Sequence, residues 1–357
     1  MKWDPKLNPD EQQTRPLKDL IRSSLFIAAT LLLTVSMIFF VSSLSLGLGF
    51  AEILGLFLSS SIGSFHSVLR TLARTTPILM STLGLLVAFR SGVWNIGGEG
   101  QIVVGVVATT GICLFLDLPP FLTVLLALIA SFLAGGAYAA LAGFLRAKWD
   151  VNEVVVTMMQ NFIALALLQY LIDGPWNWGV GLYPRTAMIP LETRLPFIIS
   201  PLNSVFLIAL ILVYAIHVLL NKTVLGYEMR VMGDNQKVAF IHGIDTTFLT
   251  MLAMLVSGGI CGLAGSGLVL GHFFRAQAGI SGNYGFYAIA AAFIAGNRAA
   301  LVPLSSLLIA FIYEGTLGLT ALGLPHRLCE AIVGVIFIVV LLPKELGWLM
   351  GGQKDDT

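Results

Sequence analysis

Uninterrupted apolar runs limit what this chain can fold into more than any other feature of its sequence. No charged residue occurs from Leu25 to Phe40 or from Phe121 to Leu145. A helix rises about 1.5 Å per residue, so about 20 apolar residues cross the roughly 30 Å hydrocarbon core of a bilayer. The strands of an outer-membrane barrel would alternate polar and apolar residues, and these runs do not. The pattern predicts an all-α polytopic membrane protein.

The charge content leads to the same class. Only 11% of the 357 residues are charged, whereas an average soluble domain has roughly 25%. This is too little charge for a soluble enzyme, a disordered chain or a nucleic-acid-binding module. Cys113, Cys261 and Cys329 all lie in apolar runs. We therefore expect them to be small buried hydrophobic side chains and not a disulfide set or a metal site.

About ten stretches are candidate transmembrane helices. Residues 50–70 contain several Ser and Gly and are predicted to form an interfacial helix. Residues 173–199 hold Trp176, Trp178, Tyr183 and four prolines, and are predicted to form a structured external loop. We expect a short N-terminal segment (1–24), a transmembrane domain (25–345) and a tail (346–357). The candidate spans are 25–49, 72–89, 96–116, 120–145, 154–172, 200–220, 247–270, 284–297, 301–320 and 328–342.

The distribution of Lys and Arg predicts the orientation of these spans. If both termini are cytoplasmic, 14 of the 20 basic residues fall on the cytoplasmic side. Cytoplasmic loops of membrane proteins carry an excess of Lys and Arg, so this orientation is favoured over its reverse. The six basic residues left on the outer side are Arg70, Arg74, Arg185, Arg194, Arg275 and Arg327.

Small residues recur at helical spacing inside several spans. They form the patterns Gly258-x-x-x-Gly262, Gly267-x-x-x-Gly271 and Ala139-x-x-x-Gly143. Such pairs let two helices approach closely in a membrane. We interpret them as packing positions.

Two apolar segments are short for a span. Residues 77–89 and 284–296 have 13 residues each, and would cover only about 20 Å. Short or Gly-interrupted segments in corresponding halves of a transporter indicate a substrate path near the midplane. We therefore predict broken or short helices there.

The segment from Arg90 to Gln101 is the most unusual in the chain. It reads RSGVWNIGGEGQ, and its three glycines around Glu99 disfavour a regular helix. A helix break at membrane depth must line a cavity or be buried in protein. Asn95, Glu99 and Gln101 could then bind a hydroxyl-rich or nucleobase-bearing solute. In the alternative, the segment is a cytoplasmic turn whose Glu99 is solvated or paired with Arg90.

Further polar residues lie within the predicted spans. Asn161 and Asn283 are additional candidates for the solute path, because polar residues inside a membrane are often functional. Glu153 and Glu314 are acidic residues in or near spans.

The predicted cytoplasmic loop 221–245 has its own local pattern. Residues 227–232 and 236–242 are predicted helical, with a turn at Gly233-Asp234-Asn235. A short amphipathic hairpin of this kind could dock on a soluble partner or lie on lipid headgroups. No Gly-x-x-x-x-Gly-Lys-[Ser/Thr] motif occurs in the chain, so any ATP hydrolysis must take place on another subunit.

Four stretches resemble one known family. The chain is similar to permease subunits of bacterial ABC importers of the ribose and branched-chain amino acid type. Within that type it most resembles the nucleoside or "simple sugar" branch, which works with basic membrane lipoproteins. The run Asn95-Ile-Gly-Gly-Glu-Gly-Gln101 is the most specific part of the match. The four stretches are 89–101, 230–244, 257–265 and 284–298.

The resemblance implies partners that the chain itself does not contain. It implies a paralogous permease (heterodimer, or alternatively homodimer), a cytoplasmic ABC ATPase that carries ATP and Mg, and an external substrate-binding lipoprotein. It also implies the bacterial plasma (inner) membrane as location, no enzyme activity, and no cofactor or nucleic acid bound by this chain. The substrate path would include Trp94, Asn95, Glu99, Gln101, Asn161 and Asn283. The ATPase coupling residues would be Gly226, Glu228, Arg230, Gly233, Asn235 and Gly243.

Departures from the family pattern leave the solute open. Trp94 stands where the branch usually has Phe, and Gln236 stands where Pro is common. A nucleoside is the leading substrate, and a simple sugar such as ribose is the alternative. An ion-coupled secondary transporter is a different class, for which Glu99, Glu153 and Glu314 would be the candidate ion-binding residues. An intramembrane enzyme would need a catalytic cluster, and the spacing of His, Asp and Ser offers none.

Overall fold

The computed structural model describes residues 47–178, 183–296 and 298–321, together with Ser36, Ala331 and Gly334. The candidate spans 25–49 and 328–342 and both terminal segments therefore lie wholly or mainly outside the described residues. The helices are α2 (Phe50–Ile62), α3 (Phe65–Arg90), α4 (Gly98–Phe115), α5 (Pro120–Trp149), α6 (Glu153–Asp173), α7 (Val205–Lys222), α8 (Val224–Asp234), α9 (Gln236–Ile241), α10 (Thr246–Leu268), α11 (Tyr284–Ile294) and α12 (Val302–Thr320).

Short elements connect these helices. A π-helical turn, η2 (Val269–Phe273), extends α10, and the 3-10 turns are η1 (Leu191–Thr193) and η3 (Ala299–Leu301). Strands β1 (Phe197–Ile199) and β2 (Leu202–Asn203) pair antiparallel before α7.

Seven helical segments among the described residues are long and apolar enough to span a membrane. They confirm seven of the predicted spans and a multi-pass helical membrane protein. The segment predicted at 284–297 forms the shorter helix α11. The seven are 65–90, 98–115, 120–149, 153–173, 205–222, 246–273 and 299–320.

The prediction of a short span at 77–89 is wrong. α3 runs unbroken for 26 residues, about 39 Å, through Pro77. Its start is fixed by Ser64, whose side chain accepts the backbone N–H of Ser67 at 3.0 Å. The predicted interfacial helix over 50–70 is therefore divided between α2 and the first turns of α3, and the membrane position of α2 stays a prediction.

The chain divides into two compact units, Met1–Ser60 with Gly315–Thr357, and Ser61–Glu314. In the described part of the first unit, Ile53 and Leu319 are buried together. A Cβ on Gly315 would lie 2.4 Å from the ring of Phe57. The second unit contains the site described below.

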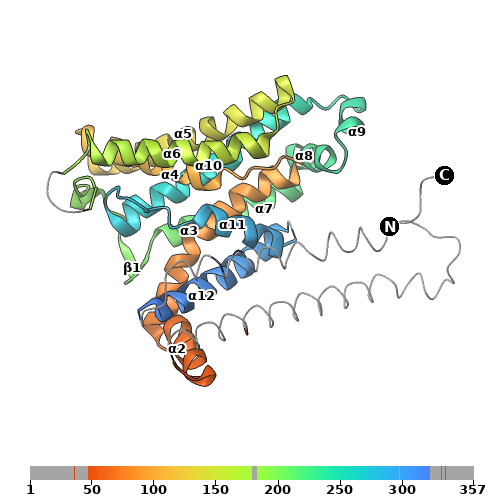
Figure 1. The fold of residues 1–357 in the computed structure, drawn as a ribbon. Coiled ribbons are helices and arrows are strands. Elements are labelled where there is room, and N and C mark those ends of the chain that lie inside the picture. The colour runs from red at the N-terminus through yellow and green to blue at the C-terminus, as the bar shows by residue number, and fades with distance from the viewer. Residues whose placement is uncertain are drawn as a thin grey trace, which may run out of the picture. The chain divides into compact units, whose positions relative to one another are not determined.

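Helices α4, α5 and α10 form the tightly packed part of the second unit (Figure 1). A Cβ on Gly262 would lie 2.1 Å from the carbonyl oxygen of Ser131, and one on Gly258 would lie 2.4 Å from that of Gly135. Real Cβ atoms do not approach so closely, so α5 and α10 touch through their backbones. The predicted packing role of Gly258-x-x-x-Gly262 is confirmed.

The connections of the second unit gather at two opposite ends (Figure 1). The segments after α3, α5 and α7 lie with α8 and α9, whereas the segment after α6 and strand β1 lie at the other end. The latter segment is held by backbone bonds, such as Thr186 N–H to Ala276 O at 2.9 Å and Ile189 N–H to Phe274 O at 2.8 Å. These bonds hold residues 186–189 of the predicted loop 173–199 against residues 274–276, and the external location of the loop stays a prediction.

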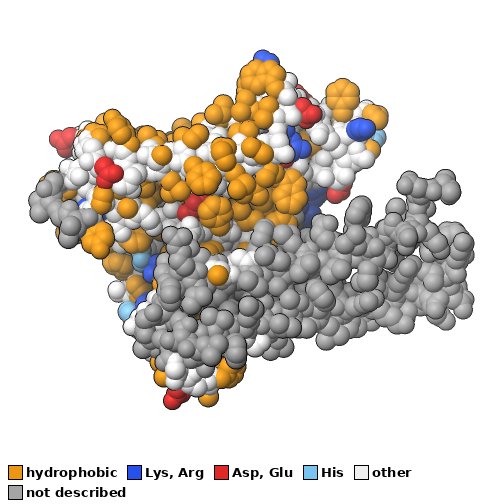
Figure 2. Space-filling view, viewed as in Figure 1, with side chains coloured by type: hydrophobic (Ala, Val, Ile, Leu, Met, Phe, Trp, Pro, Cys, Tyr) orange, Lys and Arg blue, Asp and Glu red, His pale blue; other side chains and the backbone are white. Residues whose placement is uncertain are grey.

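The outer faces of α5 and α6 are apolar. Figure 2 shows hydrophobic side chains over this surface and charged side chains mainly toward its ends. Phe121 is 81% exposed and Phe162 is 62% exposed. In a membrane protein, such a surface faces lipid or another membrane subunit.

Candidate functional site

The helix break predicted near Arg90 lies between α3 and α4. α3 ends at Arg90, residues 91–97 are not helical, and α4 begins at Gly98. The expectation that glycines disrupt the helix around Glu99 is wrong in detail, because Gly98 and Gly100 lie in the first turn of α4. A Cβ on Gly100 would lie 2.9 Å from the Cα of Asn161, so this glycine lets α4 approach α6 closely.

Helix α6 shows how far the break extends. At intervals of one helical turn, three of its side chains bind the segment. Glu153 Oε1 accepts the N–H of Trp94 at 3.2 Å, Thr157 Oγ1 accepts that of Ile96 at 3.2 Å, and Asn161 Oδ1 accepts that of Gly100 at 2.8 Å. Glu153 and Asn161 are eight residues apart, so the segment descends about 12 Å along α6.

Asn95 and Gln101 form a buried pair of amides inside this break. Each donates to the other, at 3.0 Å from Asn95 Nδ2 and 2.8 Å from Gln101 Nε2. Asn95 Nδ2 also donates to Ser257 Oγ at 2.9 Å, and Asn95 Oδ1 accepts the N–H of Gly97 at 2.9 Å. Neither side chain is exposed. The pair fastens the non-helical segment to α10 and to the start of α4.

Glu99 caps another helix. It is 2% exposed, and its Oε1 and Oε2 accept the backbone N–H groups of Asn283 at 3.1 Å and Gly285 at 2.8 Å. The Ser281 side chain also hydrogen-bonds to it. These donors stand at the N-terminus of α11, where free N–H groups and the helix dipole favour a negative charge. The alternative in which Glu99 is solvated or pairs with Arg90 is wrong.

Helix α11 starts inside the protein. The π-turn η2 ends α10 at Phe273, Phe274 adopts a left-handed φ of 58°, and residues 275–283 are not helical. α11 then covers 11 residues, about 16 Å, roughly half of a membrane crossing. The predicted short segment at 284–296 is confirmed. A Cβ on Gly285 would lie 2.2 Å from the backbone nitrogen of Glu99, so glycine is needed where the two helix starts meet.

Trp94 is the exposed member of the predicted path, at 47%. Its ring lies 5.8 Å from that of Phe89 and 5.7 Å from that of Phe293, and these two rings are 5.5 Å apart. The three aromatic rings join the ends of α3 and α11 to the start of the break. Whether any of the six predicted path residues touches solute stays a prediction.

The hairpin α8–α9 forms much as the sequence predicts. Helix α8 is longer than expected at both ends, whereas α9 starts at Gln236 as predicted and ends one residue earlier. Gly233 lies in the last turn of α8, so that Asn235 alone makes the turn. A Cβ on Gly226 would lie 2.0 Å from the carbonyl oxygen of Leu219, which fixes α8 against α7.

Gly233 brings the hairpin onto the end of α3. A Cβ on it would lie 2.2 Å from the carbonyl oxygen of Arg90, and one on Gly92 would lie 3.0 Å from the Cα of Gly233. The hairpin therefore touches the first residues of the helix break directly.

The other predicted coupling residues shape the hairpin. Asn235 accepts the N–H of Lys237 at 3.0 Å, Gly243 has a left-handed φ of 77°, and Arg230 donates to the carbonyl of Leu220. Glu228 is half-buried. We did not identify the exposed apolar residues of the hairpin from the sequence, although they interrupt a polar loop. They are Val224, Tyr227, Val238, Phe240 and Ile241.

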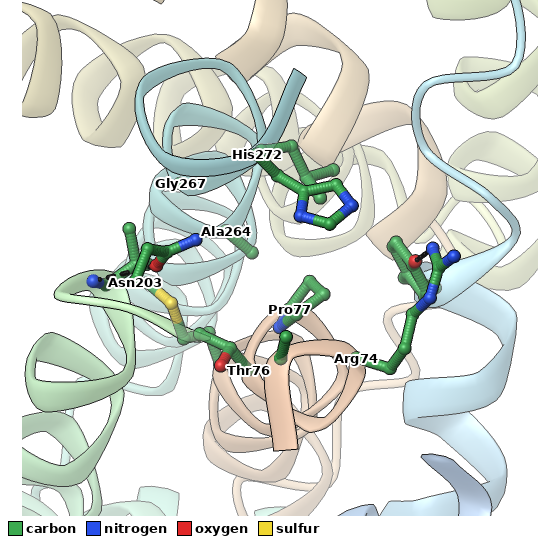
Figure 3. Close-up of a pocket in the computed structure, with 12 residues that line it drawn as sticks. Arg74, Thr76, Pro77, Asn203, Ala264, Gly267 and His272 are labelled. Carbon is green, nitrogen blue, oxygen red and sulfur yellow. Dashed lines mark hydrogen bonds between the residues drawn. The ribbon is translucent and has the colours of Figure 1, made fainter. Parts of the chain in front are cut away.

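A second polar cluster lies in the part of α3 farther from the hairpin, around a cavity of about 20 Å³ (Figure 3). Arg74 of α3 donates to the hydroxyl of Tyr284 at 2.7 Å and pairs with Glu314 at 3.4 Å. We did not identify this cluster from the sequence, because Arg74 was assigned only to the outer end of the predicted span 72–89. The sequence pattern that could have revealed it is the spacing of Arg70 and Arg74, because residues four positions apart share a helix face.

Comparison with known proteins gives consistent matches over most of the chain. Residues 67–341 match the family described as "Branched-chain amino acid transport system / permease component". The chain is 32% identical over 301 residues to the guanosine ABC transporter permease protein NupP of Bacillus subtilis, covering 82% of this chain and 86% of that protein. It is 28% identical over 301 residues to the glucose ABC transporter permease protein TsgB13 of Haloferax volcanii, covering 80% of this chain and 79% of that protein.

Two further relatives belong to the same group. The nucleoside ABC transporter permease protein NupB of Lactococcus lactis is 29% identical over 306 residues, covering 80% of this chain and 84% of that protein. A second guanosine ABC transporter permease protein of Bacillus subtilis, NupQ, is 28% identical over 207 residues, covering 55% and 64%.

Proposed function

The chain belongs to the branched-chain amino acid transport system permease family, and from that premise we propose that it forms the translocation path for a nucleoside, with ATP hydrolysed by a partner subunit. It is an ABC importer permease of the nucleoside branch, and thus a transport component and not an enzyme. The choice of a nucleoside rests on the names of NupP and NupB.

The observation that carries this proposal is the helix start capped by Glu99. A half-length helix begins inside the protein, and its first N–H groups are bound by a carboxylate from a second helix start. Discontinuous helices of this kind surround substrate sites in transporters. Their irregular backbone can change conformation without breaking a long helix, which suits alternating access.

The hairpin α8–α9 is the proposed docking site for the ATPase. Phe240 and Ile241 are 74% and 79% exposed on α9, which suits burial in a groove of a soluble partner. Through Gly233, a displacement of the hairpin would reach Gly92 and the segment that leads to Glu99. ATP-driven movement could thus be transmitted to the start of α11.

We assign the remaining partners by similarity. A paralogous permease is supported by NupP and NupQ, which carry the same transport name in one organism; a homodimer is the alternative. An external lipoprotein would deliver the solute to the end that carries β1. The bacterial plasma membrane is the expected location.

A simple sugar is the second candidate solute, because TsgB13 is named as a glucose permease. An ion-coupled mechanism receives less support. Its three candidate carboxylates already have partners in the protein: Glu153 pairs with Arg146, Glu314 with Arg70 and Arg74, and Glu99 with backbone N–H groups.

Uptake by a deletion strain tests the substrate. We expect loss of labelled guanosine uptake and its restoration by the intact gene, with glucose and ribose uptake unchanged. Normal nucleoside uptake together with lost sugar uptake would refute a nucleoside as the substrate and support a simple sugar.

A further inference from the structure

The cavity in Figure 3 lies among α3, the segment before α7, α10 and the first residue of α11. Arg74, His272 and Tyr284 stand on its wall, and Thr76 and Asn203 add further polar groups. Charged residues within a membrane-spanning helix are costly, and they usually face the protein interior or a solute path. The cluster therefore needs an explanation beyond packing.

Arg74 is held in place but keeps hydrogen-bonding capacity. Its Nη1 donates to Tyr284, its Nε faces Glu314, and its guanidinium lies 5.6 Å from the ring centre of Tyr313. Its Nη2 group has no hydrogen-bond partner among the described residues. A guanidinium has five N–H donors, so Arg74 can still bind a ligand.

His272 has the same property. It lies on the π-turn that ends α10, and its ring packs edge-on against Phe273 at 4.7 Å. No hydrogen bond joins the imidazole to any side chain or backbone group in the part of the chain that the structure describes. π-turns occur frequently at functional sites. Arg74 and His272 thus present open polar groups to one cavity.

We propose that Arg74, His272 and Tyr284 form a subsite that binds the hydroxylated ring of the transported solute, the pentose of a nucleoside or a hexose. This inference rests on the proposed function. Arginine donors, an imidazole and a phenol can bind hydroxyl groups, and neighbouring aromatic rings such as Tyr313 suit the flat faces of a sugar or base.

The subsite is closed in this structure. A cavity of about 20 Å³ holds about one water molecule and no sugar. Admitting a solute requires Arg74 to leave the Tyr284 hydroxyl, and Pro77 in the next turn of α3 weakens the helix where it would have to bend. Tyr284 is the first residue of α11, so the solute would act on the same helix start that Glu99 caps.

Transport rates of Arg74→Gln at saturating solute test the subsite. Saturation removes differences in delivery by an external binding protein. The rate is measured for two pairs of solutes, guanosine with 2′-deoxyguanosine and glucose with 2-deoxyglucose. The pair whose rate ratio changes in the variant shows whether the subsite binds a pentose or a hexose. We expect the rate to fall about tenfold or more, the effect of one lost charged hydrogen bond. We also expect the ratio of hydroxylated to deoxy solute to move toward one.

Arg70→Gln is the matched control. Arg70 lies one turn away and also pairs with Glu314, at 3.2 Å, but it does not line the cavity. We expect its rate to stay within about twofold of wild type, because the Arg70 side chain is 43% exposed and Glu314 keeps its pairing with Arg74. Tyr284→Phe removes one hydroxyl and should shift the ratio even if Arg74→Gln assembles poorly.

Two results would overturn the subsite. The first is a wild-type ratio in both Arg74→Gln and Tyr284→Phe. The second is an equal loss of transport in Arg70→Gln. A wild-type chain that transports none of the four solutes would instead refute the proposed function, and with it the solute class of this subsite.

Discussion

Glu99→Gln is the substitution that probes the helix start most sharply. It keeps the size of the side chain but replaces one acceptor oxygen by an amide nitrogen, which only donates. In the structure both oxygens accept backbone N–H groups, from Asn283 and Gly285. One of these two donors must therefore face another donor in the variant.

The expected cost follows from these contacts. A hydrogen bond to a charged group contributes about 1.5–3 kcal/mol, and a carboxylate at a helix N-terminus adds about 0.3–2 kcal/mol. Losing both contributions destabilises the first turn of α11 by about 2–5 kcal/mol. The packing of α4, α5 and α10 does not depend on this carboxylate, so folding and assembly should persist.

Transport and assembly should consequently separate. We expect Glu99→Gln to lower the transport rate about tenfold or more, while the purified complex keeps its subunits. Glu99→Asp keeps the charge on a shorter side chain, so its transport rate should lie between those of the wild type and Glu99→Gln. Normal transport by Glu99→Gln would refute the reasoning, since the cap would then be dispensable.

Three other substitutions test separate parts of the account. Gly233→Leu should leave the ATPase bound but reduce transport strongly, because even its Cβ would meet the Arg90 carbonyl at 2.2 Å; unchanged transport with bound ATPase would contradict the contact. Phe240→Asp should release the ATPase on co-purification, and retained ATPase would exclude α9 from the docking surface. Asn95→Ala should lower thermal stability, because it leaves Gln101 and Ser257 without a buried partner, at a cost of about 1–3 kcal/mol per group; an unchanged midpoint would mean that water replaces the amide.

Local patterns in the sequence were sufficient to predict most spans and the hairpin. Apolar runs such as 120–145 need only their length to be recognised, and Asn235 can be read as a turn residue from its neighbours. The helix break was also visible, because glycine and amide residues cluster between two apolar runs.

Contacts between distant residues account for what the sequence could not predict. Glu99 meets Asn283 and Gly285, more than 180 positions away. The glycines around Glu99 suggested a disrupted helix, but they serve close approach of α4 to α6 and α11. Only the folded chain shows which backbone each glycine meets.

The length of α3 was underestimated for the same reason. Arg70 and Arg74 interrupt the apolar pattern, so that Arg70 fell outside the predicted span 72–89 and Arg74 was assigned to its outer end. Their partner Glu314 lies 240 residues after Arg74. A charge that is paired across such a distance looks unpaired in the sequence, so the helix seemed to begin later than it does.

ATP-dependent solute uptake by the purified, reconstituted complex tests the central claim most directly. The account predicts that an ATPase co-purifies with the tagged chain, and that labelled guanosine enters proteoliposomes only when ATP is supplied on the side of the ATPase. Uptake by this chain alone, driven by a proton or sodium gradient and without any co-purifying ATPase, would contradict it.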